Sequence, residues 1–236
     1  MHDLRAAVRQ LFKSPGFTAV ALLTLALCIG ANSAIFSVVQ GILLKPYPWF
    51  ESDRLVSVYN TYPLMNLPNA NSSIRDYLDR REQVTGFADS ALYHSQSLNL
   101  ISEGEPERLA AMVATPSLFS TLRAGAQLGR VFLEEDALPG APATVVLSHD
   151  LWHNRFGADP AIVGRTIRLN GQPVIVIGVM PNHFYFPTPK TQLWTPFVFK
   201  PAERTDAERG TEYSSMIARL KPGATYPEVQ SELNLI

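Results

Sequence analysis

Two histidines four positions apart are the residues of this sequence that most suggest metal chemistry. In the run His149-Asp150-Leu151-Trp152-His153 they lie at positions i and i+4, which share a helix face, as the paired histidine ligands of zinc proteases do. Those enzymes carry a glutamate after the first histidine as the general base, whereas this sequence has the shorter aspartate. The sequence offers no obvious third ligand. We interpret the run as a helix face that packs Leu151 and Trp152 inward, with a membrane-anchored metal hydrolase as an alternative.

The rest of the sequence carries no motif for nucleophilic or nucleotide chemistry. It contains neither the Gly-x-Ser-x-Gly turn of hydrolases nor a phosphate-binding loop ending in Gly-Lys-Ser or Gly-Lys-Thr. The acidic run Glu134-Glu135-Asp136 precedes Pro139-Gly140 and is typical of a solvated loop. We expect no catalytic residue, no cofactor and no metal, so the chain is not predicted to be an enzyme.

Composition narrows the function classes further. The chain has 236 residues, of which 46% are hydrophobic and 17% charged, a balance that favours a folded protein over a disordered one. The formal net charge of -1 lacks the basic surplus of nucleic-acid-binding proteins, so no nucleic acid is expected as a partner. The single cysteine, Cys28, cannot form an intramolecular disulfide.

The apolar residues are concentrated near the amino terminus. No charged residue lies between Lys13 and Lys45, and residues 17–44 read FTAVALLTLALCIGANSAIFSVVQGILL. About 20 apolar residues in a helix suffice to cross a bilayer, so 17–44 is predicted to be a transmembrane helix in contact with membrane lipid. Ala31-Asn32-Ser33 resembles part of a signal-peptide cleavage site, which leaves a cleaved signal as an alternative. Apolar residues resume directly after it, which favours a retained helix.

The charges that flank the predicted span indicate its orientation. Arg5, Arg9 and Lys13 precede it with only Asp3 against them. The positive-inside rule therefore places the amino terminus in the cytoplasm and the rest of the chain outside it. Residues 1–16 alternate apolar and basic residues at helical spacing, which predicts a cytoplasmic amphipathic segment.

Small residues recur every four positions along the predicted span. Small side chains at this spacing let helices approach closely in lipid, although they are also common in membrane helices generally. We hypothesise that they contact another membrane helix, in a homodimer or a partner permease subunit, and that the polar Asn32 also faces a helix rather than lipid. The residues form two sets: Ala26, Gly30 and Ala34, and Ser33, Ser37 and Gly41.

Beyond the span, the pattern is that of a water-soluble domain of mixed helices and strands. Turn residues separate the elements, and Asn170-Gly171 is the strongest hairpin signal. The polar stretch 200–212 is predicted to be a loop, and 194–196 a short edge strand. The remaining strands are expected at 54–61, 90–101, 107–114, 144–147, 162–169, 174–179 and 216–220, and the helices at 73–84, 117–122, 149–156 and 226–235.

Several segments in a fixed order resemble one family of membrane proteins. Taken together, they are similar to MacB/FtsX-type ABC transporter permeases, and especially to the large permeases abundant in acidobacteria. The segments are LRAAVRQLFKSPGFTAVALLTLALCIGANSAIFSVVQGILLKPYPW, ATPSLFSTLRAGAQLGRVFLEED, VVLSHDLWHNRFGADPAIVGRTIRLNGQPVIVIGVMP and LWTPF.

The resemblance implies an α+β fold class, with an N-terminal transmembrane helix followed by a two-lobed MacB-like periplasmic core domain at 50–236. The porter-like lobe would comprise about 50–125 and 213–236, and the sabre-like lobe about 126–212. Family members have three further membrane helices, so the sequence is expected to be the N-terminal portion of a permease, single-pass as it stands.

The resemblance also implies a function in the bacterial inner membrane. The permease would couple ATP-driven helix motion to the extracytoplasmic domain in efflux or mechanotransmission. The ATPase would be a separate subunit, and a periplasmic adaptor would be a further partner. A stand-alone membrane-tethered binding module is the alternative.

Overall fold

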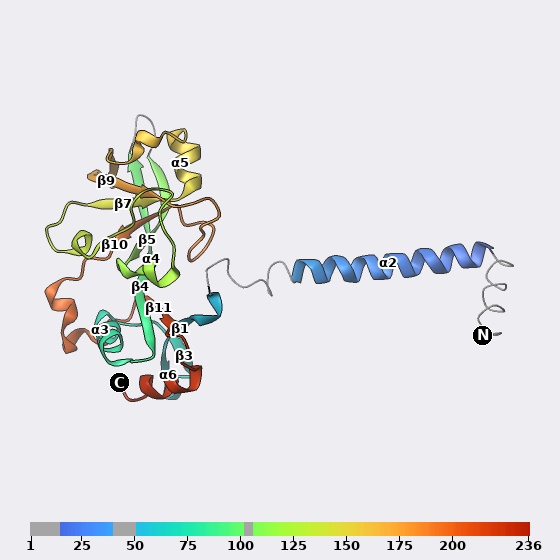
Figure 1. Cartoon of the computed structure of the whole chain (residues 1–236), viewed down its shortest axis with the longest axis horizontal. Coiled ribbons are helices and arrows are strands. Elements are labelled where there is room, and N and C mark those ends of the chain that lie inside the picture. The colour runs from blue at the N-terminus through green and yellow to red at the C-terminus, as the bar shows by residue number, and fades with distance from the viewer. Residues whose placement is uncertain (1–14, 40–50, 102–105) are drawn as a thin grey trace. The chain divides into compact units, whose positions relative to one another are not determined.

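A computed structural model describes residues 15–39, 51–101 and 106–236 (Figure 1). The chain divides into two compact units, residues 1–48 and 49–236, and each is considered by itself. The predicted amphipathic segment 1–16 falls almost wholly outside the described residues, as do the last residues of the predicted span.

The first unit contains one long helix, α2 (Pro15–Val39). Proline is favoured at the first helical position, where its missing N–H costs no hydrogen bond, and the alanines and leucines that follow are strong helix formers. Residues Pro15–Phe36 have a mean hydropathy of 2.1 and are not buried against the rest of the described chain. Their length of about 33 Å at 1.5 Å per residue matches the ~30 Å hydrocarbon core of a bilayer. The helix therefore covers the predicted span from residue 17 through Val39, and residues 40–44 of that span lie outside the described residues.

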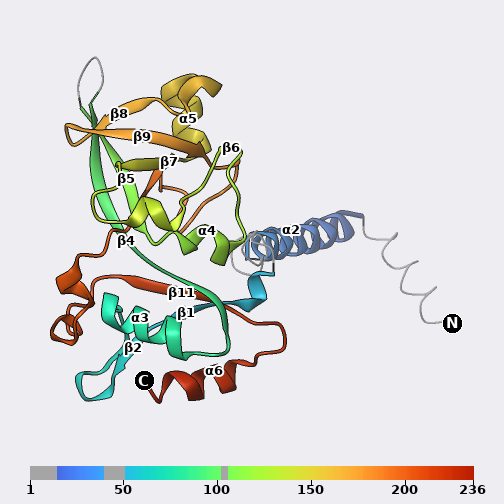
Figure 2. The same ribbon diagram turned by 60° about the vertical axis from the view of Figure 1, so that its left-hand side comes forward.

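The second unit begins with a sheet covered by helices on one face (Figure 2). Three strands lie antiparallel in the spatial order β1 (Leu55–Val58), β11 (Ser215–Leu220) and β4 (Phe87–Ile101). The helices α3 (Ile74–Gln83) and α6 (Tyr226–Leu233) pack on this sheet and share a hydrophobic core with it. A separate hairpin of β2 (Asn60–Tyr62) and β3 (Leu67–Ala70) follows β1, with the turn η3 (Pro63–Met65) at its tip.

The other strands close into a ring that starts and ends on β4. Neighbouring strands around the ring are β4, β5 (Glu107–Ala114), β10 (Leu193–Pro196), β7 (Thr144–Leu147), β9 (Gln172–Val179) and β8 (Thr166–Leu169). β8 returns to β4 through Leu100 and Ile101, which makes a small six-stranded barrel. Its interior is filled by apolar side chains such as Leu109, Val176 and Leu193, each fully buried.

Short elements connect these strands. β6 (Leu128–Gly129) pairs with β9 outside the ring. The helices α4 (Ser117–Leu122) and α5 (His149–Phe156) follow β5 and β7 respectively. Single 3₁₀ turns occupy Ser52–Arg54, Glu134–Ala137, Pro160–Ile162, Pro201–Arg204 and Asp206–Glu208.

Local sequence explains the ends of several elements. Ser73 caps α3 by accepting a hydrogen bond from the Asp76 N–H at 3.0 Å, and the Asp76 carboxylate accepts one from the Ser73 N–H. The Ser148 hydroxyl caps α5 by accepting a hydrogen bond from the Leu151 N–H at 3.1 Å, and Gly157 ends that helix at φ 64°. Asn170 and Gly171 both have positive φ, as a two-residue hairpin turn between β8 and β9 requires.

Most predicted elements are confirmed, including the α+β class, but three strand predictions are wrong. The predicted strand 162–169 begins only at Thr166, because Pro160–Ile162 form a 3₁₀ turn before it. The predicted strand 54–61 is broken after Val58, because β1 pairs with β11 whereas β2 pairs with β3 in a different sheet. The predicted edge strand at 194–196 is not an edge: β10 lies between β5 and β7, with Trp194 fully buried. The two-lobe division of the core domain stays a prediction.

A substitution at Gly178 tests how closely β9 approaches the backbone of Leu128 and Arg130, in and after β6. A Cβ at this position would lie 2.1 Å from the Arg130 carbonyl oxygen, a backbone atom that cannot rotate away. We expect Gly178→Ala to lower the free energy of unfolding by about 1–3 kcal/mol. Urea unfolding of the detergent-solubilised chain, followed by tryptophan fluorescence, measures this. The control is Gly125→Ala, whose Cβ meets no atom within 4 Å, and equal effects of both variants would contradict the packing argument.

Candidate functional site

The small residues of α2 gather on one side of the helix. At 100° per residue, Ala26, Gly30, Ser33 and Ala34 fall within about 100° of the helix circumference, and the backbone position of Ser37 belongs to the same sector. Ala26, Gly30, Ser33 and Ala34 are exposed, and a Cβ built on Gly30 would meet no atom within 4 Å. Gly41 lies outside the described residues. The face is thus available to another helix, and its packing role stays a prediction.

Asn32 lies on the opposite side of α2. It is two residues from Gly30 and therefore about 200° around the helix. If both the small-residue face and the Asn32 amide avoid lipid, the helix needs neighbours on two sides. The polar Thr24 needs no neighbouring helix as a hydrogen-bond partner, because its hydroxyl donates to the Val20 carbonyl oxygen at 2.8 Å.

Where the chain enters the second unit, two arginines fasten it to the end of β11. Arg54 Nε and Nη2 donate to the Leu220 carbonyl oxygen at 3.0 and 2.6 Å. Arg219, only 2% exposed, donates from Nη1 to the Glu51 carbonyl oxygen at 2.9 Å and from Nε to the Thr121 carbonyl oxygen at 2.7 Å. Burial lowers the pKa of the Arg219 guanidinium. We call Arg54 and Arg219 with these partners the entry clamp.

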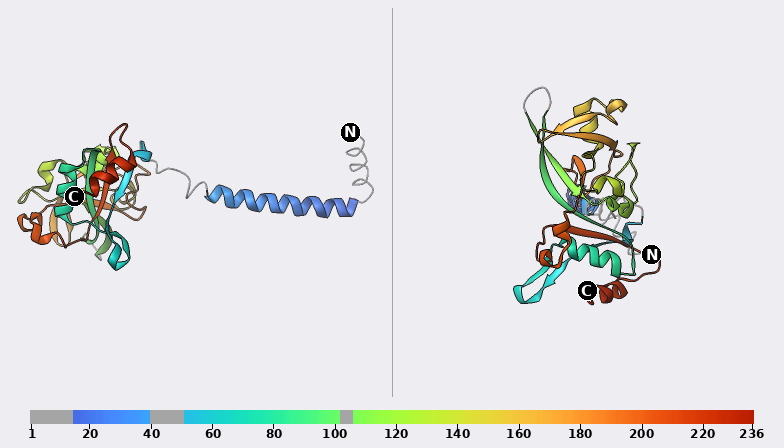
Figure 3. Two further views of the ribbon diagram at one scale, coloured as in Figure 1. Left: turned by 90° about the horizontal axis from the view of Figure 1, so that it is seen from below. Right: turned by 90° about the vertical axis from the view of Figure 1, so that its left-hand side faces the viewer.

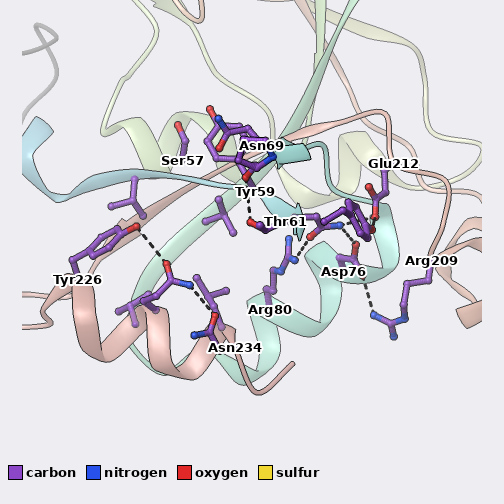
Figure 4. A pocket seen from close by; sticks show the side chains of 18 of the residues that line it. Ser57, Tyr59, Thr61, Asn69, Asp76, Arg80, Arg209, Glu212, Tyr226 and Asn234 are labelled. Carbon is purple, nitrogen blue, oxygen red and sulfur yellow. Dashed lines mark hydrogen bonds and ion pairs between the residues drawn. The ribbon is translucent and has the colours of Figure 1, made fainter. Parts of the chain in front are cut away.

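A cavity of about 730 Å³ lies between β1, the β2–β3 hairpin and the helices α3 and α6 (Figure 4). The end beside α6 has apolar side chains and three hydrogen-bonded polar ones. The apolar ones are Val56, Val58, Leu220, Val229 and Leu233, and the polar ones are Tyr226, Gln230 and Asn234. The other end is polar and charged. Its side chains come from β2, α3 and the 209–212 segment.

The polar end is a connected network around Asn60. Its Nδ2 donates to Asp76 Oδ2 at 3.0 Å and to Glu212 Oε1 at 2.7 Å, while its Oδ1 accepts from Arg80. Tyr62 donates its hydroxyl to the same Glu212 oxygen. These groups satisfy one another, so the network fixes the positions of the elements that carry it.

Arg209 connects this network to a second aspartate of α3 and to the 206–209 segment. It donates to Asp76 Oδ1 at 2.9 Å, Asp79 Oδ2 at 2.7 Å and Asp206 Oδ1 at 2.9 Å. Arg75 pairs with Asp79 and Asp206 as well. The predicted loop 200–212 is thus tied to α3 and contains two 3₁₀ turns.

The charges shift the pKa values of the groups they surround. Burial alone would raise the pKa of Asp76, but hydrogen bonds from Asn60, Ser73 and Arg209 and the charge of Arg80 outweigh it and hold this pKa below its ordinary value. Burial lowers the pKa of Arg80 despite the neighbouring carboxylates. The hydrogen bond to Glu212 raises the pKa of Tyr62.

Sequence reasoning did not single out this cavity. The capping pair Ser73 and Asp76 and the i, i+4 pair Asp76 and Arg80 were visible as signals on one helix face. Asn60 and Arg209 are more than 140 positions apart in the sequence. Nothing in the local sequence shows that both contact Asp76 of α3. Only the tertiary structure brings them together.

His149 and His153, the pair behind the alternative of a metal hydrolase, have no third candidate ligand beside them among the described residues. Their rings stack with centroids 5.9 Å apart, and Leu151 and Trp152 are buried, as the packing interpretation expected. No group of three or more His, Cys, Asp or Glu side chains with metal-site geometry occurs within 15–39, 51–101 or 106–236. In the acidic run, Asp136 pairs with Arg130 at 2.6 Å and accepts the Leu133 N–H at 2.8 Å.

An apolar helix of membrane-spanning length precedes this sheet architecture in the chain. The profile of the MacB-like periplasmic core domain family matches residues 18–236. The chain therefore belongs to the MacB-like periplasmic core domain family. The resemblance to MacB-type ABC transporter permeases is confirmed.

Solved structures show the same fold. The extracellular domain of the noncanonic ABC-type transporter YknZ from Gram-positive bacteria is 18% identical with a TM-score of 0.53, and the match covers 75% of this chain and 86% of that one. A domain of a permease protein from Porphyromonas gingivalis is 17% identical with a TM-score of 0.58, covering 78% and 82%. The periplasmic region of MacB from Actinobacillus actinomycetemcomitans is 16% identical with a TM-score of 0.55, covering 76% and 79%. A comparison with curated proteins gave no match.

Gly30 and Ala34 test the small-residue face. We expect Gly30→Leu and Ala34→Leu to weaken association of the chain in membranes, because a larger side chain keeps the helix backbones apart. Chemical crosslinking in native membranes measures the associated fraction. Ala31→Leu changes a residue that lies outside this face and should leave crosslinking unchanged. Equal crosslinking of all variants and the unsubstituted chain would refute the assignment.

Asp76 tests the ionic network. We expect Asp76→Ala to lower the free energy of unfolding by about 1–3 kcal/mol, because it removes the carboxylate that accepts from the Ser73 N–H, from Asn60 and from Arg209. Asp206→Ala, which also contacts Arg209 but is 79% exposed, should cost no more than about 0.5 kcal/mol. Urea unfolding of the two variants in detergent distinguishes them.

The network also predicts an acid dependence. Since the pKa of Asp76 is lower in the folded state, its stabilising contribution is complete above its unfolded pKa of about 3.9 and is lost as the pH falls through the folded value. The unsubstituted chain should therefore lose stability more steeply below about pH 4 than Asp76→Asn does. Parallel curves would contradict this assignment.

Proposed function

We propose that this chain is a permease subunit of an ABC-type efflux or mechanotransmission system in a bacterial inner membrane. One observation carries the proposal: a single chain joins a helix long enough to cross a bilayer to a MacB-like periplasmic core domain. In this proposal the amino terminus is cytoplasmic and the second unit is periplasmic, as the basic residues before α2 favour.

The second unit has the connections that mechanical coupling requires. The entry clamp bonds the segment after the span to β11, and β11 is paired with β4 along Phe87–Tyr93. β4 is 15 residues long, about 50 Å when extended, and continues into the barrel, where it pairs with β5 and β8. A displacement of the clamp would thus reach the barrel through hydrogen-bonded strands.

In this proposal the chain itself performs no chemical step. ATP would be hydrolysed by a separate ABC ATPase subunit, and a periplasmic adaptor would be a further partner. The sequence lacks a phosphate-binding loop, which supports the assignment of ATP hydrolysis to a separate subunit. A second copy of the permease would supply a neighbour for the small-residue face of α2.

A stand-alone tethered binding module is the second candidate. The cavity of about 730 Å³ favours it, because ligand pockets typically fall within 300–1,000 Å³. Its polar end, however, is occupied by side chains that pair with one another. A binding module would work without an ATPase, and that difference separates the two candidates.

The entry clamp provides the test. The permease is reconstituted in nanodiscs with its ABC ATPase, and spin labels are placed at Leu138→Cys, an exposed position, in a Cys28→Ser background. We expect ATP binding to shift the distance between labels on the two permease subunits. Arg54→Ala should reduce that shift, since it removes both bonds to Leu220.

The matched control is Arg165→Ala, which removes an exposed arginine of the barrel and should leave the shift unchanged. ATP hydrolysis is measured on the same samples. Coupling is refuted if the label distances are the same with ATP and ADP, and that result would favour the tethered binding module.

A further inference from the structure

The sheet of the second unit divides at His94 of β4. Tyr93, the residue before it, pairs with Ser215 of β11 on one edge and with Ala114 of β5 on the other. His94 pairs with Val113 of β5, and β11 has no residue opposite it, because that strand begins at Ser215. β4 then continues into the barrel (Figure 3). His94 is therefore the first residue of β4 beyond the point where the helix-covered sheet ends and the barrel begins.

Two aromatic rings from other segments pack against His94 at this point. The ring centroid of Phe197 lies 4.8 Å from that of His94 and the centroid of Tyr213 lies 5.1 Å from it, both rings at a steep angle to the imidazole. Phe197 follows β10 of the barrel, and its N–H donates to the Ala114 carbonyl oxygen at 2.8 Å, whereas Tyr213 comes just before β11. We call His94, Phe197 and Tyr213 the fork cluster. It holds the chain that leaves the barrel and the chain that enters β11 against one residue of β4.

The surroundings of His94 suit a neutral imidazole. The ring is half-buried, and its Nδ1 lies 3.5 Å from the Ser214 hydroxyl oxygen, at the long limit of a hydrogen bond. Burial lowers the pKa of His94, because the imidazolium would lose part of its hydration. No carboxylate of the described residues contributes to the pKa shift of His94 as a compensating charge. A proton on His94 would thus place an unpaired charge among aromatic rings.

The other titratable groups beside the fork cluster keep their charge states in mild acid. Burial and the charge of Glu203 raise the pKa of Tyr213, so this phenol stays neutral. Glu212, the residue before Tyr213, accepts hydrogen bonds from Asn60 and Tyr62. Phe197 and the β5 partner of His94 carry no titratable group. Within the fork cluster, His94 is therefore the group whose charge changes between neutral pH and mild acid.

We propose that His94 is a proton-sensitive contact that holds the barrel to the helix-covered sheet at neutral pH and releases it in mild acid. The neutral ring packs against Phe197 and Tyr213. The imidazolium regains its hydration by leaving those rings, and the barrel can then change its angle to the helix-covered sheet while β4 keeps its strand pairing. Since the folded pKa of His94 is lowered, the contact contributes fully above the unfolded pKa of about 6.5 and is lost as the pH falls through the folded value.

The test measures the distance between the two parts of the second unit within one chain. Spin labels are placed at Thr166→Cys on β8 and Ser231→Cys on α6, both exposed positions, in a Cys28→Ser background. The labelled chain is diluted with unlabelled chain in detergent, and distances are measured at about pH 7.5 and about pH 4.5, where histidines titrate but most aspartates stay ionised. We expect the distance distribution to be about twofold wider in acid. Equal distributions would overturn the proposal.

Two variants identify the group that responds. His94→Phe keeps an aromatic ring that cannot be protonated, so its distribution should stay narrow at both pH values. His153→Phe replaces an exposed histidine and should keep the acid response of the unsubstituted chain. An acid response that persists in His94→Phe would refute the assignment to His94.

Histidine NMR of the unsubstituted chain gives a measurement that needs no variant to fold. The His94 signal is identified by its nuclear Overhauser contacts with the rings of Phe197 and Tyr213. We expect it to titrate at a lower pH than the signal of the exposed His153. Titration at the same or a higher pH would mean that the rings stabilise the imidazolium, which overturns the proposal. Neither measurement involves ATP, so failure here would leave the ATP-coupling test unaffected.

Discussion

Residues Phe87–Ile101 form one uninterrupted strand that passes through two different packing environments. Near its start, Ala91 and Leu92 are both fully buried, because one side chain faces the core around Trp194 and the other faces the core beneath α3 and α6. Further on, Leu98 and Leu100 point into the barrel while Asn99 between them faces solvent. A strand cannot shift its register in one environment without moving its side chains to the wrong face in the other. The arrangement of the whole second unit depends on this constraint.

Around β4, the two ends of the domain are stabilised by different forces. The barrel has an apolar interior, so its stability comes mainly from burial. The helix-covered end adds charged contacts in which Arg209 joins α3 to a segment more than a hundred residues away. The entry clamp adds buried charge-assisted hydrogen bonds where the chain enters the domain. These contacts are directional, in contrast to the apolar burial that stabilises the barrel.

Local signals predicted many elements with nearly their observed bounds. A serine cap marked the start of α3, Gly157 marked the end of α5, and Asn170-Gly171 marked the hairpin of β8 and β9, because these residues act within a few positions of themselves. Predictions failed where pairing was non-local: the strand at 54–61 is divided between two sheets, and β10 is central rather than an edge. A short strand carries no information about which distant strand it will meet.

The sequence by itself determined that an uncharged helix of membrane-spanning length precedes a mixed α and β domain, and that this domain resembles the MacB family. The first conclusion rests on composition and spacing, and the second on the resemblance that the ordered segments carry. Only the tertiary structure decided that six strands close into a barrel, that Asn60 and Arg209 meet α3, and that His94 packs against Phe197 and Tyr213. Each of these depends on contacts between residues far apart in sequence, which form only when burial and strand pairing are satisfied together.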